Sequence, residues 1–309
     1  MKLTVVIPAF KAARFIDEAL SSVVNSTIDS CVVVSEDGVF DDLSLILASY
    51  PSTILITSDV NRGAAAARNL GLDHVSTEYC FFLDADDYVD ESLFEGLLDV
   101  LESTGADVAF GPWAFVHDGR RSSNIKYPSS RTNEGVVAAW LKNDCYPPCC
   151  VMWRTDSLRK LGGWDSSFRH NDDAELIIRA MMTNLKLAVS HKGCGFYVQH
   201  DSNERVSRAS SVVASNAADR IFTKVAAWDG HDAIQPALMA FAYEQARRAY
   251  RSGETALGHM WLNRARLLGF EGHMGTFAHR ILATILGLGL KEKIASYRDR
   301  SPFLKHRHR

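Results

Sequence analysis

The apolar residues of the first hundred positions fall into short runs separated by stretches with helical spacing. The runs at residues 3–7, 31–34, 53–56 and 79–83 have the length and unbroken apolar character of strands that are buried on both faces. Between them, apolar side chains recur three and four residues apart, as over residues 15–24. Strands that alternate with helices are typical of a parallel sheet with crossover helices, so the pattern predicts an α/β fold.

The next hundred residues contain shorter elements. Two runs at 113–116 and 123–127 flank Asp118-Gly119, a dipeptide that favours a tight turn, and they predict an antiparallel hairpin. Gly162-Gly163-Trp164-Asp165 predicts a loop. The other expected elements are helices at 93–101, 134–141 and 172–184 and strands at 107–110 and 151–153.

The last third of the chain has a helical pattern almost throughout. Residues 243–251 and 256–268 predict a helical hairpin about Ser252-Gly253. One hairpin argues against an independent repeat domain, which normally needs at least three repeats, and favours a helical extension of the preceding domain. The expected organisation is therefore a domain at 1–210, with halves at 1–110 and 111–210, followed by a helical C-terminal extension at 211–309.

Composition and charge describe an ordinary globular chain. Its 309 residues carry 34 basic and 37 acidic side chains, a formal net charge of −3, and 47% are apolar. This balance excludes a uniformly basic nucleic-acid-binding protein and an acidic disordered chain, so no nucleic-acid partner is expected. The six cysteines lack C-x-x-C spacing and are expected to be reduced. Without a signal peptide or an apolar stretch of about 18 residues, a cytoplasmic protein is expected.

The charge is unevenly distributed along the chain. Residues 291–309 contain seven lysines and arginines against Glu292 and Asp299, a net charge of +5, and they follow an apolar stretch at 281–290 that predicts a helix. One interpretation is a peripheral contact of the basic C-terminus with the inner face of an anionic membrane. The other is a helix packed on the protein with a solvated basic tail. The sequence leaves both open.

Polar residues follow each of the first four predicted strands. They occupy positions 8–10, 36–38, 61–63 and 84–87. In open parallel sheets, ligands bind in the crevice at the carboxyl ends of the strands. These four clusters therefore predict one binding site at that edge of the sheet.

The most acidic of these clusters is Asp84-Ala85-Asp86-Asp87. Its three carboxylates repel one another. A divalent cation such as Mg²⁺ or Mn²⁺ would compensate, because it binds one or two carboxylates and completes its shell with water and substrate phosphates. The alternative is an acidic helix N-terminus, with Asp86 or Asp87 capping a helix that begins near Glu91.

A second cluster, Asn61-Arg62-Gly63, precedes an alanine-rich helix. Arg62 is placed to meet a phosphate near a helix N-terminus, and the alternative is a solvated surface arginine. No G-x-G-x-x-G sequence follows the first predicted strand, which argues against a nicotinamide or flavin dehydrogenase.

Six motifs in one order give the chain a more specific character. It resembles the family 2 glycosyltransferases, whose GT-A fold is a Rossmann-like, mostly parallel sheet with flanking helices. The resemblance implies an inverting transfer of a sugar from a nucleotide diphosphate sugar, most often a UDP-sugar, to an acceptor hydroxyl. The motifs are VVIPAF (5–10), VSEDG (34–38), NRGAAAARNLGL (61–72), FLDADD (82–87), GGWDSSF (162–168) and DDAELIIR (172–179).

The resemblance implies roles for residues that bind the nucleotide. Pro8 and Ala9 would shape the floor of the nucleotide pocket, with Phe10 beside them. Asp37 would contact the base or the ribose, and Arg62 would lie near the base and the phosphates. Three departures from the usual pattern, at Lys11, Glu36 and Val39, bear on nucleotide selectivity more than on activity.

The remaining roles concern the transfer itself. Asp84 would bind the ribose or the sugar, and Asp86 would hold the Mn²⁺ or Mg²⁺ that bridges the phosphates. Asp173 would be the general base, because a carboxylate must accept the proton of the attacking hydroxyl. Asp172, where the family usually has glutamate, would lie near the acceptor.

Two further residues each have an alternative. Trp164 offers an apolar face for a sugar ring, or it belongs to the core. His200 lies where similar proteins often have a histidine and would bind the metal or a phosphate, or it makes ordinary hydrogen bonds.

The expected function is transfer to a saccharide or a lipid-linked acceptor in cell-surface polysaccharide or glycolipid synthesis. The alternatives are a catalytically silent sugar-nucleotide binding protein, against which Asp173 argues, and a metal-dependent nucleotidyltransferase.

Overall fold

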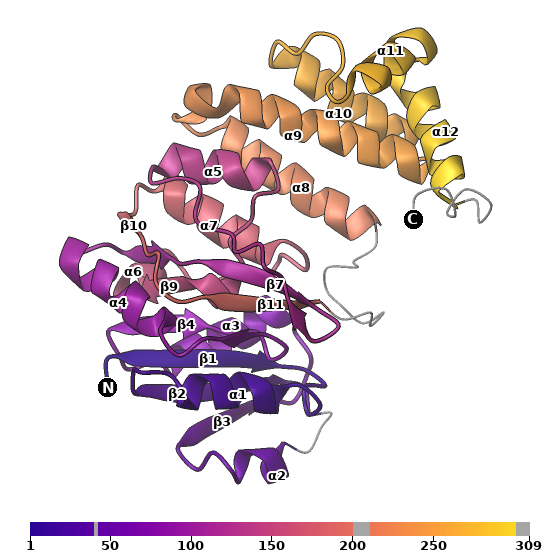
Figure 1. Cartoon of the computed structure of the whole chain (residues 1–309). Helices are drawn as coiled ribbons and strands as arrows, with labels where there is room; N and C mark the ends of the chain where they lie inside the picture. The colour runs from indigo at the N-terminus through magenta and orange to yellow at the C-terminus, as the bar shows by residue number, and fades with distance from the viewer. Residues whose placement is uncertain (40–42, 200–210, 301–309) are drawn as a thin grey trace. The chain divides into compact units, whose positions relative to one another are not determined.

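The computed structural model describes residues 1–39, 43–199 and 211–300 (Figure 1). The chain divides into one unit of Met1–Trp140 with Cys145–Ala209 and another of Leu141–Asp144 with Ser210–Arg309. The first unit is built on a seven-stranded sheet of order β10-β6-β9-β4-β1-β2-β3. The strands of this sheet are β1 (Leu3–Ala9), β2 (Ser30–Asp37), β3 (Thr53–Ser58), β4 (Tyr79–Phe82), β6 (Val108–Phe110), β9 (Val151–Arg154) and β10 (Leu187–Val189).

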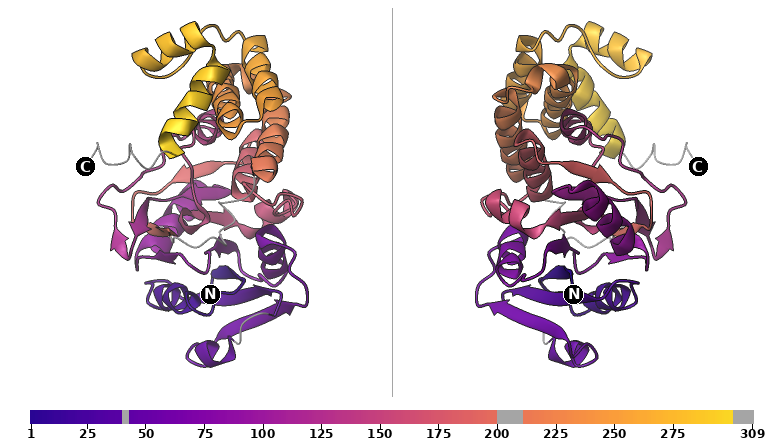
Figure 2. Two further views of the ribbon diagram at one scale, coloured as in Figure 1. Left: turned by 90° about the vertical axis from the view of Figure 1, so that its right-hand side faces the viewer. Right: turned by 90° about the vertical axis from the view of Figure 1, so that its left-hand side faces the viewer.

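The sheet is mostly parallel, as the alternating pattern predicts. β1 pairs in parallel with β2 and β4, β2 with β3, and β6 with β10, whereas β9 runs antiparallel to β4 and β6. Figure 2 shows helices on both faces of this sheet. The helices of the first unit are α1 (Ile16–Val24), α2 (Ser44–Leu47), α3 (Ala64–Asp73), α4 (Leu93–Thr104), α5 (Asn133–Leu141), α6 (Thr155–Lys160) and α7 (Asp172–Met182).

The central strand β1 shows why its sequence is unbroken in apolar character. Leu3, Val5 and Ile7 point to one face, where they join a buried cluster with side chains of α1 and α4. Val6 points to the other face and meets α3, where a Cβ on Gly71 would lie 2.2 Å from its Cγ1. Both faces are therefore covered, and glycine at position 71 allows the close approach of α3.

The expectation of a fully buried strand at residues 53–56 is wrong. β3 lies at the edge of the sheet, and the side chains of Ile54 and Leu55 are 48% and 40% exposed. A strand at a sheet edge has a neighbour on one side only, so its apolar run does not guarantee burial.

A second sheet of order β5-β11-β7-β8 adjoins the first in the same unit. Its strands are β5 (Tyr88–Val89), β11 (Gly195–Gln199), β7 (Trp113–His117) and β8 (Arg120–Arg121). The hairpin about Asp118-Gly119 is present, but its second strand is β8 rather than residues 123–127, which contribute one bridge between Trp113 and Lys126. A two-residue turn at Asp118-Gly119 brings Arg120 and Arg121 directly opposite His117 and Val116, so the second strand begins immediately after Gly119.

The second unit is helical, with α8 (Ser211–Ala226), α9 (His231–Ser252), α10 (Thr255–Leu267), α11 (Phe277–Leu286) and α12 (Leu288–Arg300). α9 and α10 form the expected hairpin, in which Gly253 ends α9 with a φ of 90°. The single helix expected at 281–290 is instead divided between α11 and α12. Gly287, with a φ of 75°, separates them, because that backbone conformation cannot continue a helix.

All six cysteines are free thiols, four of them buried. Among the described residues, no helix is both long and apolar enough to cross a bilayer.

Candidate active site

The register of the first sheet brings the predicted polar clusters to one edge. Ala9 pairs with Glu36, Asp37 pairs with Ser58, and the amide of Leu83 donates to the carbonyl of Val6. The chain therefore leaves β1, β2 and β4 side by side. Pro8 is half-buried, Ala9 is buried, and Phe10 is 43% exposed at this edge.

Asp37 anchors the loop that contains Arg62. Its two carboxylate oxygens accept hydrogen bonds from the backbone amides of Arg62 and Gly63, each 2.7 Å long. The Asp37 side chain is buried, whereas that of Arg62 is exposed. The structure thus holds the loop of Arg62 at the end of β2 through backbone hydrogen bonds, and direct contacts of either side chain with a nucleotide stay predictions.

A buried arginine on α3 joins two of the predicted acidic residues. Nη2 of Arg68 donates to Asp84 Oδ1 at 2.5 Å, and Nη1 donates to Asp172 Oδ2 at 2.7 Å. Although burial opposes the charge of Arg68, these two carboxylates raise its pKa, so the guanidinium is a permanent cation. Arg68 therefore links the turn after β4 to the N-terminus of α7 across one planar group.

The neighbouring residue on α3 anchors the Gly162-Gly163 loop. Asn69 donates to the carbonyl of Trp164 at 2.8 Å and accepts from the amide of Trp164 at 2.9 Å. The loop is held from its other side by Arg179 of α7, which donates to the carbonyl of Gly163 at 2.7 Å. Two adjacent residues of α3 thus contact the first residue of α7 and the loop that precedes it.

Trp164 belongs to the core of the first unit. Its side chain is 4% exposed, packs edge-on against Phe82 with ring centroids 5.3 Å apart, and lies under the guanidinium of Arg68 at 4.4 Å. The core alternative therefore describes this structure better than an open stacking face for a sugar. Trp164 supports Arg68 through a cation–π contact.

Asp173 lies at the start of α7 in a mostly apolar environment. It lines a small pocket whose other walls include Phe82, Trp153 and Leu176. Burial, and then the negative charge of Asp172, raise the pKa of Asp173 to about 7, although the amide of Ala174 donates to it at 2.8 Å and Arg68 acts in the opposite direction. A carboxyl group with this pKa is suited to exchange a proton near neutral pH.

The acidic residues Asp86 and Asp87 of the turn after β4 differ in burial. Asp87 is buried, and its Oδ1 accepts the amide of Val198 at 2.9 Å, which ties the turn to the end of β11. Asp86 is half-buried on the same turn. His200 follows β11 directly in the sequence and lies outside the described residues. Within the described ranges, no group of three or more His, Cys, Asp or Glu residues is arranged to hold a metal ion.

Sequence reasoning missed Arg68, which connects the site. It stands in the motif NRGAAAARNLGL, in which the phosphate contact is predicted for the exposed Arg62. The available signal was an arginine that directly follows four alanines in a predicted helix, since a charge on a buried helix face requires a partner.

The sequence of this chain matches a known protein family. A profile of glycosyl transferase family 2 matches residues 4–162. The minor teichoic acid biosynthesis protein GgaB of Bacillus subtilis is 27% identical over 188 residues, which are 56% of this chain and 20% of GgaB. The glycosyltransferase GlyA of Streptococcus pneumoniae is 31% identical over 114 residues, which are 36% of this chain and 16% of GlyA. The chain thus matches a fifth or less of these two relatives.

The fold also has counterparts among solved structures. S. aureus TarS 1–349 in complex with UDP-GlcNAc superposes with a TM-score of 0.69 and 17% identity, covering 96% of this chain and 89% of that one. The same protein in complex with UDP gives a TM-score of 0.65 and 16% identity, with the same coverage. The expected fold class, a mostly parallel sheet with flanking helices and a helical C-terminal region, is confirmed.

Proposed function

This chain belongs to glycosyl transferase family 2, and on that premise we propose that it is an inverting enzyme that moves a sugar from a UDP-sugar to an acceptor hydroxyl. The observation that carries the proposal is the Asp84–Arg68–Asp172 bridge, which joins the turn expected to bind the donor to the helix that presents Asp173. Solved complexes of TarS with UDP-GlcNAc and UDP support a uridine nucleotide.

The transfer assigns one proton to Asp173. The acceptor oxygen attacks C1 of the sugar from the face opposite the diphosphate, the new C1–O bond forms as the bond from C1 to the phosphate oxygen breaks, and the diphosphate leaves with the electron pair. The acceptor proton passes to the carboxylate of Asp173. The raised pKa of Asp173 favours this step, because a base with a pKa near the working pH accepts a proton readily and releases it afterwards.

We propose that a divalent cation binds at the turn after β4, through Asp86. Asp86 would supply a hard oxygen ligand from a half-buried carboxylate. On the same turn, Asp84 accepts a hydrogen bond from Arg68, and Asp87 accepts one from the amide of Val198. One or two protein carboxylates with water and phosphate oxygens are the usual ligands of Mg²⁺ in nucleotide sites. Mn²⁺ or Mg²⁺ bound by Asp86, with His200 as a second proposed ligand, would stabilise the charge of the departing diphosphate.

The biological setting follows the relatives. GgaB is named for minor teichoic acid biosynthesis, and ExoA of Rhizobium meliloti, 23% identical over 61% of this chain and 60% of ExoA, is named for succinoglycan biosynthesis. We therefore propose that the reaction serves the synthesis of a cell-surface polysaccharide or glycolipid, with a saccharide or lipid-linked acceptor.

The donor is tested by thermal unfolding with UDP, GDP and dTDP, each with and without Mn²⁺. A nucleotide at about 100 times its Kd stabilises the native state by about 2.7 kcal/mol, so the preferred base produces the largest shift. We expect UDP with Mn²⁺ to give it. A larger shift with GDP or dTDP would contradict the uridine assignment.

The substitution Asp86→Ala is expected to abolish the part of the UDP-induced shift that requires Mn²⁺. The reason is that it removes the carboxylate proposed to hold the cation against the phosphates. Asp99→Ala, which alters an exposed carboxylate on α4, is the matched control and should retain the shift. An unchanged Mn²⁺ dependence in the Asp86 variant would assign the metal to other ligands.

The pH dependence of kcat/KM is expected to have an acidic limb near pH 7. Asp173 accepts a proton only as a carboxylate, and its raised pKa leaves it protonated at lower pH, so kcat/KM should fall about tenfold per unit below that point. Initial rates of UDP release with saturating Mn²⁺ at each pH measure this limb. A profile that is flat from pH 5 to about 7 would contradict the assigned base.

A further inference from the structure

The helix α11 is packed the opposite way from a helix of an ordinary soluble protein. Its buried residues are His279 and the small Ala283, whereas its large apolar side chains face solvent. Phe277, Ile281 and Ile285, spaced by four residues on one face, are 71%, 41% and 72% exposed. Leu282 and Leu286 are exposed beside them. A helix normally turns its apolar stripe inward, so an outward stripe of this size indicates a contact surface.

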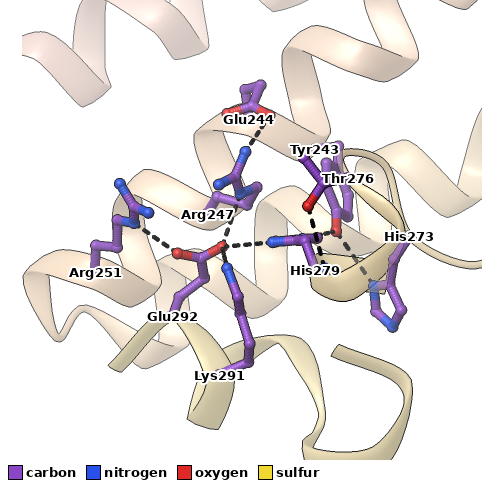
Figure 3. A network of polar contacts seen from close by, with 9 residues as sticks. All are labelled: Tyr243, Glu244, Arg247, Arg251, His273, Thr276, His279, Lys291 and Glu292. Carbon is purple, nitrogen blue, oxygen red and sulfur yellow. Dashed lines mark hydrogen bonds and ion pairs between the residues drawn. The ribbon is translucent and has the colours of Figure 1, made fainter. Parts of the chain in front are cut away.

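The next helix, α12, is packed in the same way around a buried acid. Glu292 is 0% exposed. Its two carboxylate oxygens accept hydrogen bonds from two arginines of α9, from Nε of Arg247 at 2.7 Å and from Nε of Arg251 at 2.6 Å (Figure 3). Lys291 also donates to it at 3.0 Å. Although burial opposes ionisation, these hydrogen bonds lower the pKa of Glu292 to about 2.

Polar contacts on the inner side thus determine which residues α11 and α12 expose. The ring of His279 lies 3.2 Å from the hydroxyl of Tyr243 on α9 and 3.7 Å from Glu292 (Figure 3). With Glu292 and His279 held inward, Leu290, Ile294 and Tyr297 of α12 are left 52%, 51% and 67% exposed. α11 and α12 pack against each other on either side of Gly287, and each helix leaves its large apolar side chains exposed.

The exposed charged side chains between residues 272 and 297 are basic, with Glu271 before this range and Asp299, between Arg298 and Arg300, after it in the sequence. Between residues 272 and 297 the only acidic side chain is Glu292, which is buried, while Arg280 and Lys293 are exposed. The sequence after α12 adds Lys305, Arg307 and Arg309. We use the name α11–α12 face for the exposed side chains of Phe277, Arg280, Ile281, Leu282, Ile285, Leu286, Leu290, Lys293, Ile294 and Tyr297.

We propose that the α11–α12 face docks this protein on the surface of an anionic lipid bilayer. Large apolar side chains enter the boundary between headgroups and acyl chains, and basic side chains beside them meet lipid phosphates, which is the combination that this face presents. A symmetric contact with a second copy is disfavoured by the same charges. It would bring Arg280 and Lys293 of both copies into one contact, and the α11–α12 face has no exposed acidic side chain to pair with them.

The proposal differs from an anchor made by the basic tail alone. The apolar face supplies the part of the binding that salt does not screen, and the basic residues supply the part that salt weakens. It does not depend on the reaction chemistry, so it fails or succeeds separately from the proposed glycosyl transfer.

The test is co-sedimentation of the full chain with two kinds of vesicle, phosphatidylcholine alone and phosphatidylcholine mixed with phosphatidylglycerol. We expect binding to the anionic vesicles at low salt, weaker binding at about 0.5 M salt, and much less binding to the neutral vesicles. Absence of binding to the anionic vesicles at low salt would overturn the proposal.

Two matched variants locate the surface. Ile285→Glu places a charge in the α11–α12 face and should lower the partition coefficient about tenfold or more. Leu267→Glu is the control, because the side chain of Leu267 on α10 is 78% exposed and that of Ile285 is 72% exposed. This substitution should change the partition coefficient by less than about twofold. Thermal unfolding of both variants shows that the fold is retained. Equal binding by the Ile285 variant and the unaltered protein would overturn the assignment to this face.

Two further arms distinguish the other occupants. A full-length variant with Lys305→Gln, Arg307→Gln and Arg309→Gln should bind more weakly but still measurably, and its complete loss of binding would make the tail, rather than the face, the anchor. Analytical ultracentrifugation should show that Ile285→Glu leaves the oligomeric state unchanged. Dissociation of an oligomer by this substitution would assign the face to a second copy of the chain.

Discussion

Asp173→Asn is expected to lower kcat by about 10²- to 10⁴-fold, the usual range for loss of a general base, while UDP affinity changes less than about twofold. An amide keeps the shape of the side chain and its place at the start of α7, but it cannot take the proton of the acceptor hydroxyl. Steady-state rates of UDP release and the UDP-induced shift in thermal unfolding measure the two effects separately. Equal losses of turnover and of UDP affinity would make Asp173 a binding residue.

The control for this variant is Asp156→Asn. Asp156 is the second residue of helix α6, as Asp173 is the second residue of α7, but the side chain of Asp156 is exposed. It should retain full activity and stability.

The Asp173→Asn variant should not be destabilised either. Because the pKa of Asp173 is raised in the folded state, its contribution to stability is complete below pH about 4 and is lost as pH rises towards 7. Asparagine has no such loss, so the variant should resist urea at pH 8 at least as well as the unaltered protein.

Arg68→Met is expected to destabilise the fold by about 3–5 kcal/mol, because it leaves the carboxylates of Asp84 and Asp172 without the cation that they share. Methionine fills much of the same space, so most of the loss comes from the unpaired charges rather than from a cavity. Urea unfolding at neutral pH measures the change in the free energy of unfolding.

Two substitutions bracket that result. Arg68→Lys retains a positive charge but not the planar fork that donates to both carboxylates, so it should recover part of the loss and stay below the unaltered protein. Arg120→Met removes an exposed arginine on β8 and should change the free energy of unfolding by less than about 0.5 kcal/mol. A loss below about 1 kcal/mol in Arg68→Met would show that the two carboxylates do not depend on this cation.

The elements that the sequence predicts best are those whose pattern is set by burial on known faces. β1 is apolar without interruption because α1 and α4 cover one side and α3 the other, and the parallel sheet follows from repetition of that pattern. The same pattern misleads at β3, since an apolar run does not reveal whether a strand lies inside the sheet or at its edge.

The acidic residues of the site are visible in the sequence because they follow strand ends in ordered motifs. Asp84 and Asp86 stand out in this way, and parallel strands bring such motifs to one edge, whereas Asp173 is identified by the motif DDAELIIR of the family resemblance. Arg68 is different, because nothing local shows that a helical arginine will reach Asp84, 16 residues away, and Asp172, 104 residues away. Its role appears only when the fold brings α3, the turn after β4 and the N-terminus of α7 together.

The sequence by itself therefore determines the fold class, the order of the motifs and the carboxylates available for chemistry, since these depend on local patterns of polarity and on the residue types present. The tertiary structure decides which charges meet and which helix faces stay exposed. For α11 and α12 the sequence shows an apolar stretch followed by basic residues, and it does not show which side packs. Because Arg247 and Arg251 of α9 hold Glu292 inward, while Tyr243 contacts His279, the apolar side chains face outward.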